Sequence, residues 1–154
     1  MVTSKSAEVG DRILKVTFCF ILMEEIWKDI KGFEGLYQIS NLGRIKSLAR
    51  YVYYRNGKIY HQDEKILKPC FNNKGYCRVR LTKSTNSKLF FVHRLVAMAF
   101  IPNPNNFPQI NHKDENKQNN SSNNLEWCTS LYNNNFGKKK RKQQERKTKK
   151  TSFC

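Results

Sequence analysis

Turn residues recur at short intervals from Ile26 to about Leu89, and this spacing limits the fold of that part of the chain more than any other feature. Glycine and asparagine interrupt each apolar stretch before it reaches the length of a typical helix. The breaks are Gly32, Gly35, Asn41, Gly43, Asn56-Gly57 and the segment from Asn73 to Gly75. The pattern therefore predicts short strands that form a small antiparallel sheet.

One of these breaks predicts a hairpin. Asn56-Gly57 stands between residues 51–54 and 59–60, which are rich in tyrosine and other strand-forming residues. Asparagine and glycine both tolerate the positive φ that a two-residue primed turn needs. A second strand is predicted at residues 76–81, where Arg78 and Arg80 alternate with apolar residues, so that one face can pack while the other meets phosphates or base edges.

The pattern changes after residue 88. The expected elements are, in order, a strand at 89–92, a helix at 93–100 that Pro102 ends, a loop at 102–108, strands at 109–112 and 125–128, and a helix capped by Thr129 or Ser130. We expect both tryptophans, Trp27 and Trp127, to anchor the core, and the loop asparagines Asn119, Asn120 and Asn123 to be solvated.

Charge points to a polyanionic partner. The 154 residues include 29 Lys plus Arg against 12 Asp plus Glu, a formal net charge of +17. Nucleic acid is the first candidate for such a chain. An RNA-binding module of the ribosomal kind would rest on this charge alone, and preference for structured RNA over duplex DNA in competition would support it.

The basic charge is concentrated at the C-terminal end. Residues 138–150 hold nine basic residues and one acid, beginning with Lys138, Lys139, Lys140 and Arg141. So basic a segment cannot bury enough apolar surface to fold alone. Two interpretations remain open: a solvated tail that aids solubility, or an arm that tracks DNA phosphates and makes affinity depend steeply on salt.

Cysteine usage and hydropathy indicate an intracellular protein. The five cysteines are odd in number and widely spaced, with no C-x-x-C pair, so neither a disulfide framework nor a zinc site is indicated. The apolar run at 13–23 contains a lysine and is too short to span a bilayer. We expect no membrane association and no secretion, and we treat residues 1–23 as a leader.

Several motifs follow one another along the chain: EIWKDI at 25–30, GFEGLYQISN at 32–41, GRI at 43–45, VHRLVA at 92–97, INHKDENK at 110–117, NN at 119–120, NLEWCT at 124–129, and Asn133. In this order they resemble the HNH homing endonucleases of phage and viral genomes, which carry a nuclease-associated modular DNA-binding motif ahead of an HNH nuclease. Their co-occurrence is a stronger signal than either half alone.

The resemblance implies a role for four residues. His112 corresponds to the general base, a task that suits an imidazole with a pKa near neutrality. Asn124 corresponds to the asparagine that holds the loop so that the base faces the scissile phosphate. Asn111 and Asn133 correspond to the ligands of one divalent metal ion, with Mg2+ expected and Mn2+ as a substitute. The implied reaction is hydrolysis of a DNA phosphodiester that leaves 5'-phosphate and 3'-hydroxyl ends.

Two departures from the family pattern favour a rival function. Some relatives have Asp where this chain has Asn111, and an amide binds Mg2+ less strongly than a carboxylate. Relatives often have Gly at the position of Glu115, in a turn where positive φ is costly for Glu. The rival is a DNA-binding protein whose HNH site has decayed.

The sequence therefore predicts an α+β fold with four parts. They are a leader at 1–23, a small antiparallel DNA-binding module at 24–88, a ββα-metal (HNH, or His-Me finger) nuclease at 89–137 and a basic tail at 138–154. Arg44, Lys46, Arg78 and Arg80 are the expected contacts of the module with double-stranded DNA. We expect a monomer that acts in the cytoplasm or nucleus of a host cell.

Overall fold

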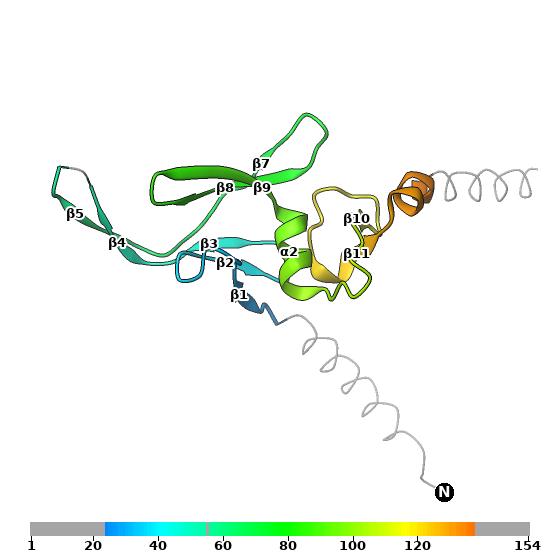
Figure 1. Cartoon of the computed structure of the whole chain (residues 1–154), viewed down its shortest axis with the longest axis horizontal. Coiled ribbons are helices and arrows are strands. Elements are labelled where there is room, and N and C mark those ends of the chain that lie inside the picture. Colours follow the sequence, from blue (N-terminus) through cyan, green and yellow to red (C-terminus); the bar gives the residue numbers. More distant parts are fainter. Residues whose placement is uncertain (1–23, 55, 138–154) are drawn as a thin grey trace, which may run out of the picture.

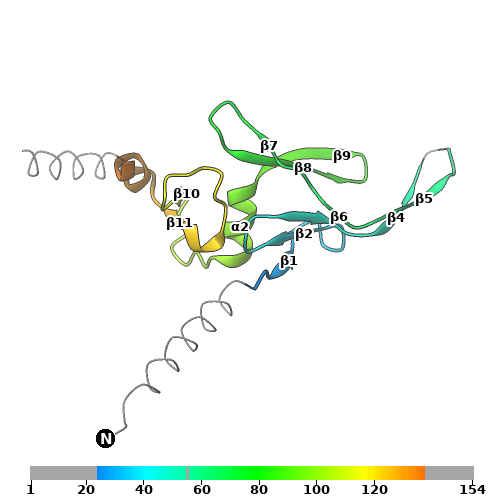
Figure 2. The same ribbon diagram turned by 180° about the vertical axis from the view of Figure 1, so that it is seen from behind.

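The computed structural model describes residues 24–54 and 56–137. The leader at 1–23 and the basic tail at 138–154 lie outside the described residues. Figure 1 shows the arrangement of the described elements, and Figure 2 shows them from behind. None of the helices formed by the described residues is both long enough and apolar enough to cross a lipid bilayer.

The strands before residue 92 pair antiparallel, as expected, but they do not form one sheet. The bounds are β1 Trp27–Asp29, β2 Tyr37–Ser40, β3 Ile45–Ser47, β4 Arg50–Tyr53, β5 Ile59–Gln62, β6 Lys65–Ile66, β7 Cys70–Phe71, β8 Cys77–Lys83 and β9 Asn86–Phe91. They divide into a β1-β2-β3-β6 sheet, a β4-β5 hairpin and a β7-β8-β9 sheet. The expectation of a single sheet is wrong, because β4-β5 and β7-β8-β9 pair only among themselves and not with the β1-β2-β3-β6 sheet.

The β4-β5 hairpin projects from the rest of the molecule (Figure 1). Its strands pair from Arg50 opposite Gln62 to Tyr53 opposite Ile59, where the sequence predicted a hairpin. The amide of Tyr54 donates to the carbonyl of Lys58 at 2.9 Å. Residues 54–58 therefore separate the last paired positions, and the expected tight two-residue turn is wrong.

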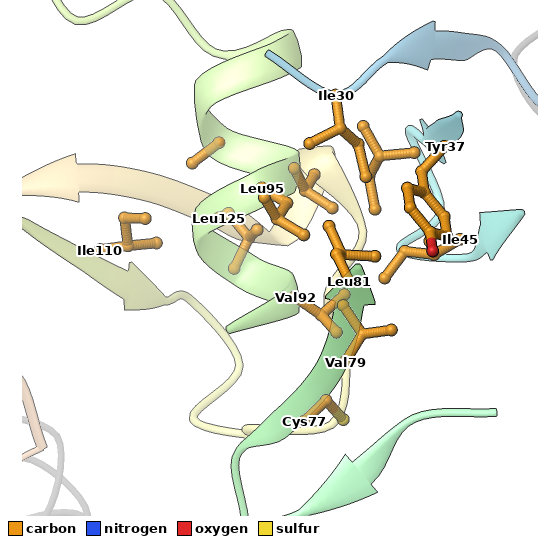
Figure 3. Close-up of a cluster of buried hydrophobic side chains, with 13 residues drawn as sticks. Ile30, Tyr37, Ile45, Cys77, Val79, Leu81, Val92, Leu95, Ile110 and Leu125 are labelled. Carbon is orange, nitrogen blue, oxygen red and sulfur yellow. The ribbon is translucent and has the colours of Figure 1, made fainter. Parts of the chain in front are cut away.

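Helix α2, Val92–Phe100, lies between the N-terminal strands and the C-terminal strand pair (Figures 1 and 2). It begins and ends close to the expected limits. Val92, Leu95 and Val96 are almost fully buried in a core that includes side chains of β2, β3, β8, β10 and β11 (Figure 3). The core therefore contains residues from both sides of residue 88. The division of the chain into a module at 24–88 and a nuclease at 89–137 stays a prediction.

Strand β8 shows the alternation that the sequence predicted. Cys77, Val79 and Leu81 are buried, whereas Arg78 is half-buried and Arg80 is exposed. Side chains of a strand alternate between its two faces, so the apolar set packs below α2 and the arginines lie on the opposite face. This strand is a part of the N-terminal half that packs directly against α2 (Figure 3).

The C-terminal strands match the sequence prediction. β10, Gln109–His112, pairs antiparallel with β11, Leu125–Cys128, and the short 3-10 helix η1, Ser122–Asn124, precedes β11. Residues 130–137 are helical. The Thr129 hydroxyl accepts a hydrogen bond from the Tyr132 amide at 3.2 Å, which makes Thr129 the cap of this helix.

The two tryptophans differ in their surroundings. Trp127 packs against the core, and its indole N–H donates to the carbonyl of Ile101 at 3.0 Å. Trp27 is not among the residues of this core, so its assignment as a core anchor is wrong. Its ring instead contacts Arg44 and Lys46, with the Lys46 ammonium 4.7 Å from the ring centroid.

A turn between β2 and β3 packs directly on the loop between β10 and β11. Gly43 has φ +84°, and a Cβ at this position would lie 2.8 Å from Cβ of Asn120 and 3.1 Å from its carbonyl oxygen. The Ser122 amide donates to the carbonyl of Asn41 at 2.8 Å beside this contact. Two segments that are distant in sequence are joined at this point by a contact that only glycine permits.

We expect Gly43→Ala to destabilise the protein by about 2–4 kcal/mol, because it adds a steric clash to the cost of a left-handed backbone. Gly35→Ala is the matched control, since Gly35 has φ +70° and nothing lies within 4 Å of its added Cβ. This control should cost about 1–2 kcal/mol from the backbone alone. Urea unfolding followed by tryptophan fluorescence measures both, and equal losses of stability would contradict the close packing on Asn120.

Candidate active site

An open pocket of about 170 Å³ lies where β10 ends beside the helical residues 130–137. It brings together three of the four residues for which the sequence predicted a role in the reaction: Asn111, His112 and Asn133. The other lining residues are Tyr76, Ile110, Glu115, Lys117, Phe136 and Gly137. The fourth predicted residue, Asn124, lies in the loop that follows His112 and does not line the pocket.

His112 is the last residue of β10 and is only 5% exposed. Its Nε2 lies 3.3 Å from Oδ1 of Asn120. Burial lowers the pKa of His112, and this effect exceeds the opposing effects of the Asn120 hydrogen bond and the Asp114 charge. The ring is therefore neutral at neutral pH, which is the form that can accept a proton.

Two further rings surround His112. The centroid of His93 on α2 lies 5.3 Å from that of His112, and the centroid of Tyr76 lies 6.1 Å away. Burial lowers the pKa of His93 to about 4, aided by the nearby charges of His112 and Arg94. Among the described residues, none makes a hydrogen bond with the buried Nδ1 of His93. His93 was not predicted from the sequence as a site residue, and its ring forms one wall around the predicted base.

The loop between β10 and β11 is held by the side chain of Asn124. Its Nδ2 donates to Asp114 Oδ1 and to the carbonyl of Asn119, both at 2.8 Å, and its Oδ1 accepts from the Asp114 amide at 3.1 Å. The carbonyl of Asn124 accepts from the Lys113 amide at 2.8 Å. Asn124 thus ties both ends of the loop together next to His112.

Asp114 is a structural residue of this loop. Its carboxylate accepts hydrogen bonds from the Asn119 side chain, the Asn124 side chain and the Asn116 amide, at 2.7 to 2.8 Å. These bonds, led by that of Asn119, lower the pKa of Asp114 and keep it ionised. Asp114 does not line the pocket. Asn119 is half-buried and is part of the loop scaffold, so the prediction of a solvated loop residue in contact with the backbone did not include its bond to Asp114.

Glu115 has φ +66°, so the costly backbone conformation anticipated from the sequence is present. Its amide donates to the carbonyl of His112 at 2.9 Å, which closes a tight turn directly after the predicted base. Backbone strain of this kind persists where the surrounding structure enforces it, and it concentrates at functional sites. The turn directs Glu115 to the pocket wall, where it is the one carboxylate among the lining residues described.

The amides of Asn111 and Asn133 have fixed orientations. Nδ2 of Asn111 donates to Glu126 Oε1 at 2.7 Å, and Nδ2 of Asn133 donates to Gln109 Oε1 at 2.8 Å. Within the part of the chain that the structure describes, neither Oδ1 accepts a hydrogen bond. Both side chains line the pocket, so each can present a carbonyl oxygen to a ligand there.

This donor set fits a hard divalent cation. Mg2+ prefers oxygen ligands, and two amide oxygens in one pocket satisfy that preference without supplying charge. Residues 24–54 and 56–137 contain no group of three or more His, Cys, Asp or Glu side chains that could hold a metal ion. Any ion at Asn111 and Asn133 would therefore need further oxygen ligands from Glu115 on the pocket wall, from water or from a bound phosphate.

Lys117 supplies positive charge at the pocket. Its ammonium donates to the carbonyl of Lys74 at 2.9 Å and lies 4.9 Å from the centroid of the Tyr76 ring. Both partners belong to the N-terminal half, so this cation is held in place on the pocket wall by a segment that is distant in sequence. Lys117 belongs to the motif at 110–117, but no role was predicted for it from the sequence.

Arg44 and Lys46, two of the expected DNA contacts, are engaged within the protein. Arg44 forms an ion pair with Glu25, and the Lys46 ammonium lies 3.5 Å from Glu64 Oε1. Both also contact the Trp27 ring. The side chain of Arg44 is 57% exposed and that of Lys46 only 18%, so Arg44 is the more accessible of the two.

Arg78 and Arg80 lie on β8, in a different sheet from Lys46 on β3, and Arg44 directly precedes β3. Arg80 is exposed, whereas Arg78 is half-buried and its Nε makes no hydrogen bond within the described residues. The remaining expected DNA contacts, Lys138, Lys139, Lys140 and Arg141, lie outside the described residues.

Asn120 is the residue that sequence reasoning placed most wrongly. It was expected in solvent, but it is 5% exposed and contacts the ring of His112. The sequence contained one indication of a role for Asn120, because the pair Asn119-Asn120 is among the motifs that resemble the family. The burial of Asn120 could not be foreseen, since it depends on packing against Gly43, which is distant in sequence.

Comparison with family models gives two matches that follow one another along the chain. Residues 25–82 match the NUMOD4 motif, and residues 90–135 match an HNH endonuclease model. The second match contains Asn111, His112, Asn124 and Asn133. The two parts occur in the order that the sequence resemblance predicted.

Relatives in sequence include viral and phage endonucleases. The chain is 41% identical over 107 residues to the DNA endonuclease I-HmuI of Bacillus phage SP01, covering 70% of this chain and 54% of the relative. It is 44% identical over 84 residues to an uncharacterized HNH endonuclease, L245, of Acanthamoeba polyphaga mimivirus, covering 54% of this chain and 26% of the relative. The chain thus spans between about a quarter and about half of the length of these relatives.

A solved structure agrees with the sequence matches. The structure described as DNA binding and cleavage by the HNH homing endonuclease I-HmuI has a TM-score of 0.58 and 38% identity to this chain, covering 81% of this chain and 68% of that one. The fold is accordingly of the strand-rich, small-helix type found in that enzyme. Motif order, sequence identity and fold agree, and the chain belongs to the HNH endonuclease family, with a NUMOD4 motif ahead of its HNH segment.

Proposed function

We propose that this protein is a metal-dependent endonuclease that hydrolyses phosphodiester bonds of double-stranded DNA. The observation that carries the proposal is the pocket in which a buried neutral histidine, His112, lies beside two oriented amides, those of Asn111 and Asn133. Cleavage of DNA by the similar enzyme I-HmuI supports the choice of substrate. The products would carry 5'-phosphate and 3'-hydroxyl ends.

His112 is the proposed general base. Its ring is neutral because burial lowers its pKa, so it can take a proton from the water that attacks phosphorus. Asn124 holds the loop that fixes the position of the histidine, through its bonds to Asp114 and Asn119. Lys117 adds a fixed positive charge on the pocket wall, where it attracts the phosphate.

Asn111 and Asn133 are the proposed protein ligands of one divalent ion, Mg2+ or Mn2+. Their Oδ1 atoms are the hard donors of the pocket, and hydrogen bonds to Glu126 and Gln109 hold their Nδ2 atoms away from the ion. An ion bound there would polarise the phosphate and neutralise charge on the leaving 3' oxygen. With neutral ligands alone, binding should be weak until the phosphate arrives.

We further propose that β10, β11 and the helical residues 130–137 form the ββα core of the nuclease, and that residues 24–88 and the tail at 138–154 bind DNA. Of the four expected contacts in the module, the accessible ones are Arg44, Arg80 and the half-buried Arg78. Lys46 is less exposed and pairs with Glu64. The protein would act as a monomer inside the host cell.

A DNA-binding protein with an inactive HNH site is the second candidate. The strained backbone of Glu115 and the absence of a carboxylate at Asn111 favour it. Plasmid incubated with Mg2+ or Mn2+ separates the two functions, because only a nuclease converts supercoiled DNA to relaxed or linear forms. Mapping of the ends then distinguishes a nick from a double-strand cut.

Replacement of His112 tests the proposed base. We expect His112→Ala to lower kcat about 10²- to 10⁴-fold and to leave the Kd for DNA nearly unchanged, because the imidazole acts on water rather than on the duplex. His61→Ala is a suitable control, since His61 lies on the exposed β5 strand beside Asp63. Single-turnover cleavage and a binding titration give the two quantities. Cleavage by His112→Ala within about threefold of wild type would refute the assignment.

Replacement of Asn111 tests the metal ligands. In Asn111→Asp the Nδ2 that donates to Glu126 becomes an oxygen, so two carboxylates meet at a distance where the wild type has a 2.7 Å hydrogen bond. We expect a lower melting temperature without divalent ion and recovery with Mg2+. Mg2+ should bind about tenfold more tightly, or roughly 1.4 kcal/mol. Calorimetric titration without DNA measures this change.

The matched control is Asn111→Asp combined with Glu126→Gln. Its glutamine can donate to the new carboxylate, so the apo protein should regain stability while the ligand remains anionic. If the Mg2+ titration gives Asn111→Asp the midpoint of the wild type or a higher one, Asn111 is not a ligand. Glu115, the carboxylate on the pocket wall, would then be the next residue to replace.

Deletion of residues 138–154 tests the basic arm. We expect affinity to fall equally for all DNA sequences, because binding to phosphates carries no sequence information. The slope of log K against log salt should decrease in magnitude by about 0.9 for each phosphate that the shortened protein no longer neutralises. Cleavage of saturating DNA should persist. An unchanged slope would mean that the tail is only a solvated extension.

A further inference from the structure

We infer that Asn120 is a positioning residue that presents Nδ1 of His112 as the proton acceptor, and that the NUMOD4 segment holds Asn120 in place. The inference rests on the proposed role of His112 as general base. Neither the family matches nor the resemblance of the motifs assigns this task to Asn120. It follows from two contacts of its side chain and from the packing of its backbone.

The first contact fixes the orientation of the Asn120 amide. Nδ2 donates to the carbonyl of Gln118 at 3.0 Å, so Oδ1 is the end that faces His112, 3.3 Å from its Nε2. An amide oxygen can only accept a hydrogen bond. The proton of the neutral ring must therefore reside on Nε2, and the lone pair available to a water molecule is that of Nδ1.

Burial makes this arrangement firm. Asn120 is 5% exposed and His112 is 5% exposed, although Asn120 belongs to a polar loop and His112 directly precedes it. The buried side chain of Cys77 on β8 is close enough to Asn120 for Asn120 to act on the pKa of its thiol. A hydrogen bond between buried groups is costly to lose, because neither partner then regains water.

The position of Asn120 is set by the turn between β2 and β3. Gly43 approaches so closely that a Cβ would lie 2.8 Å from that of Asn120, and the adjoining Ser122 amide donates to the Asn41 carbonyl at 2.8 Å. Asn41 is itself fixed, since its Oδ1 accepts from the Ile26 amide at 2.9 Å. The wall behind the predicted base is thus built by residues of the NUMOD4 match, 25–82.

This geometry distinguishes Asn120 from Asn124. Asn124 bonds to Asp114 and Asn119 and shapes the loop backbone, whereas Asn120 contacts the imidazole itself. Replacement of Asn120 should therefore change the hydrogen-bonded state of the ring and the rate of proton transfer. A residue that only filled space would change stability without changing either.

The test compares Asn120→Leu with Asn120→Asp in the full chain. Leucine and aspartate both resemble asparagine in shape, and neither can donate the hydrogen bond to the Gln118 carbonyl. The two variants differ in one respect: aspartate keeps an acceptor for Nε2 of His112, and leucine does not. We expect Asn120→Leu to lower kcat about 10- to 100-fold with an unchanged KM for DNA, by analogy with removal of groups that orient a functional side chain. Asn120→Asp should recover most of this activity. Equal reductions in the two variants, or a kcat within about threefold of wild type for Asn120→Leu, would overturn the inference.

NMR of the histidine rings gives a readout that does not require cleavage. In 15N-histidine-labelled wild-type protein, His112 should show a protonated Nε2 with slow solvent exchange and an unprotonated Nδ1, with His112→Ala identifying the signal. The protected Nε2 proton should vanish in Asn120→Leu and persist in Asn120→Asp. A wild-type ring protonated on Nδ1, or an Nε2 proton that exchanges freely, would refute the inference even if a variant fails to fold. If the ring has the expected state but DNA is not cut, only the proposed function fails.

Discussion

Burial of one face of α2 is the interaction on which the rest of the structure depends. Val92, Leu95 and Val96 pack between the N-terminal strands and the β10-β11 pair, so neither half completes its core without the helix (Figure 3). The strands themselves are only two to seven residues long, and such sheets gain little stability alone. Removal of this apolar surface from water therefore holds the two family motifs in one fixed arrangement.

The fixed arrangement allows distant segments to build the pocket jointly. Tyr76 and the carbonyl of Lys74 hold Lys117, the Asn41–Gly43 turn seats Asn120, and α2 supplies His93 beside His112. The first two of these contacts join the NUMOD4 segment to the loop between β10 and β11. That segment thus contributes to the candidate nuclease site itself, in addition to any binding of DNA.

The chemistry of the pocket is unusual in its distribution of charge. Glu115 and Lys117 supply the two charged side chains of the described pocket wall, whereas Asp114 holds the loop and Glu126 orients Asn111. The two proposed metal ligands, Asn111 and Asn133, are neutral.

The sequence alone determined the elements and the local motifs, because these depend on neighbouring residues. Apolar spacing predicted α2, period-two alternation predicted β8, and the motif order predicted the family and the positions of His112, Asn111 and Asn133 at one site. The division of the strands into separate sheets, the burial of Asn120 and the proximity of His93 were decided by the tertiary structure. Those features arise from contacts such as Gly43 with Asn120, between residues far apart in the chain. The pattern of neighbouring residues cannot predict such a contact, because the two residues come together only when the core packs.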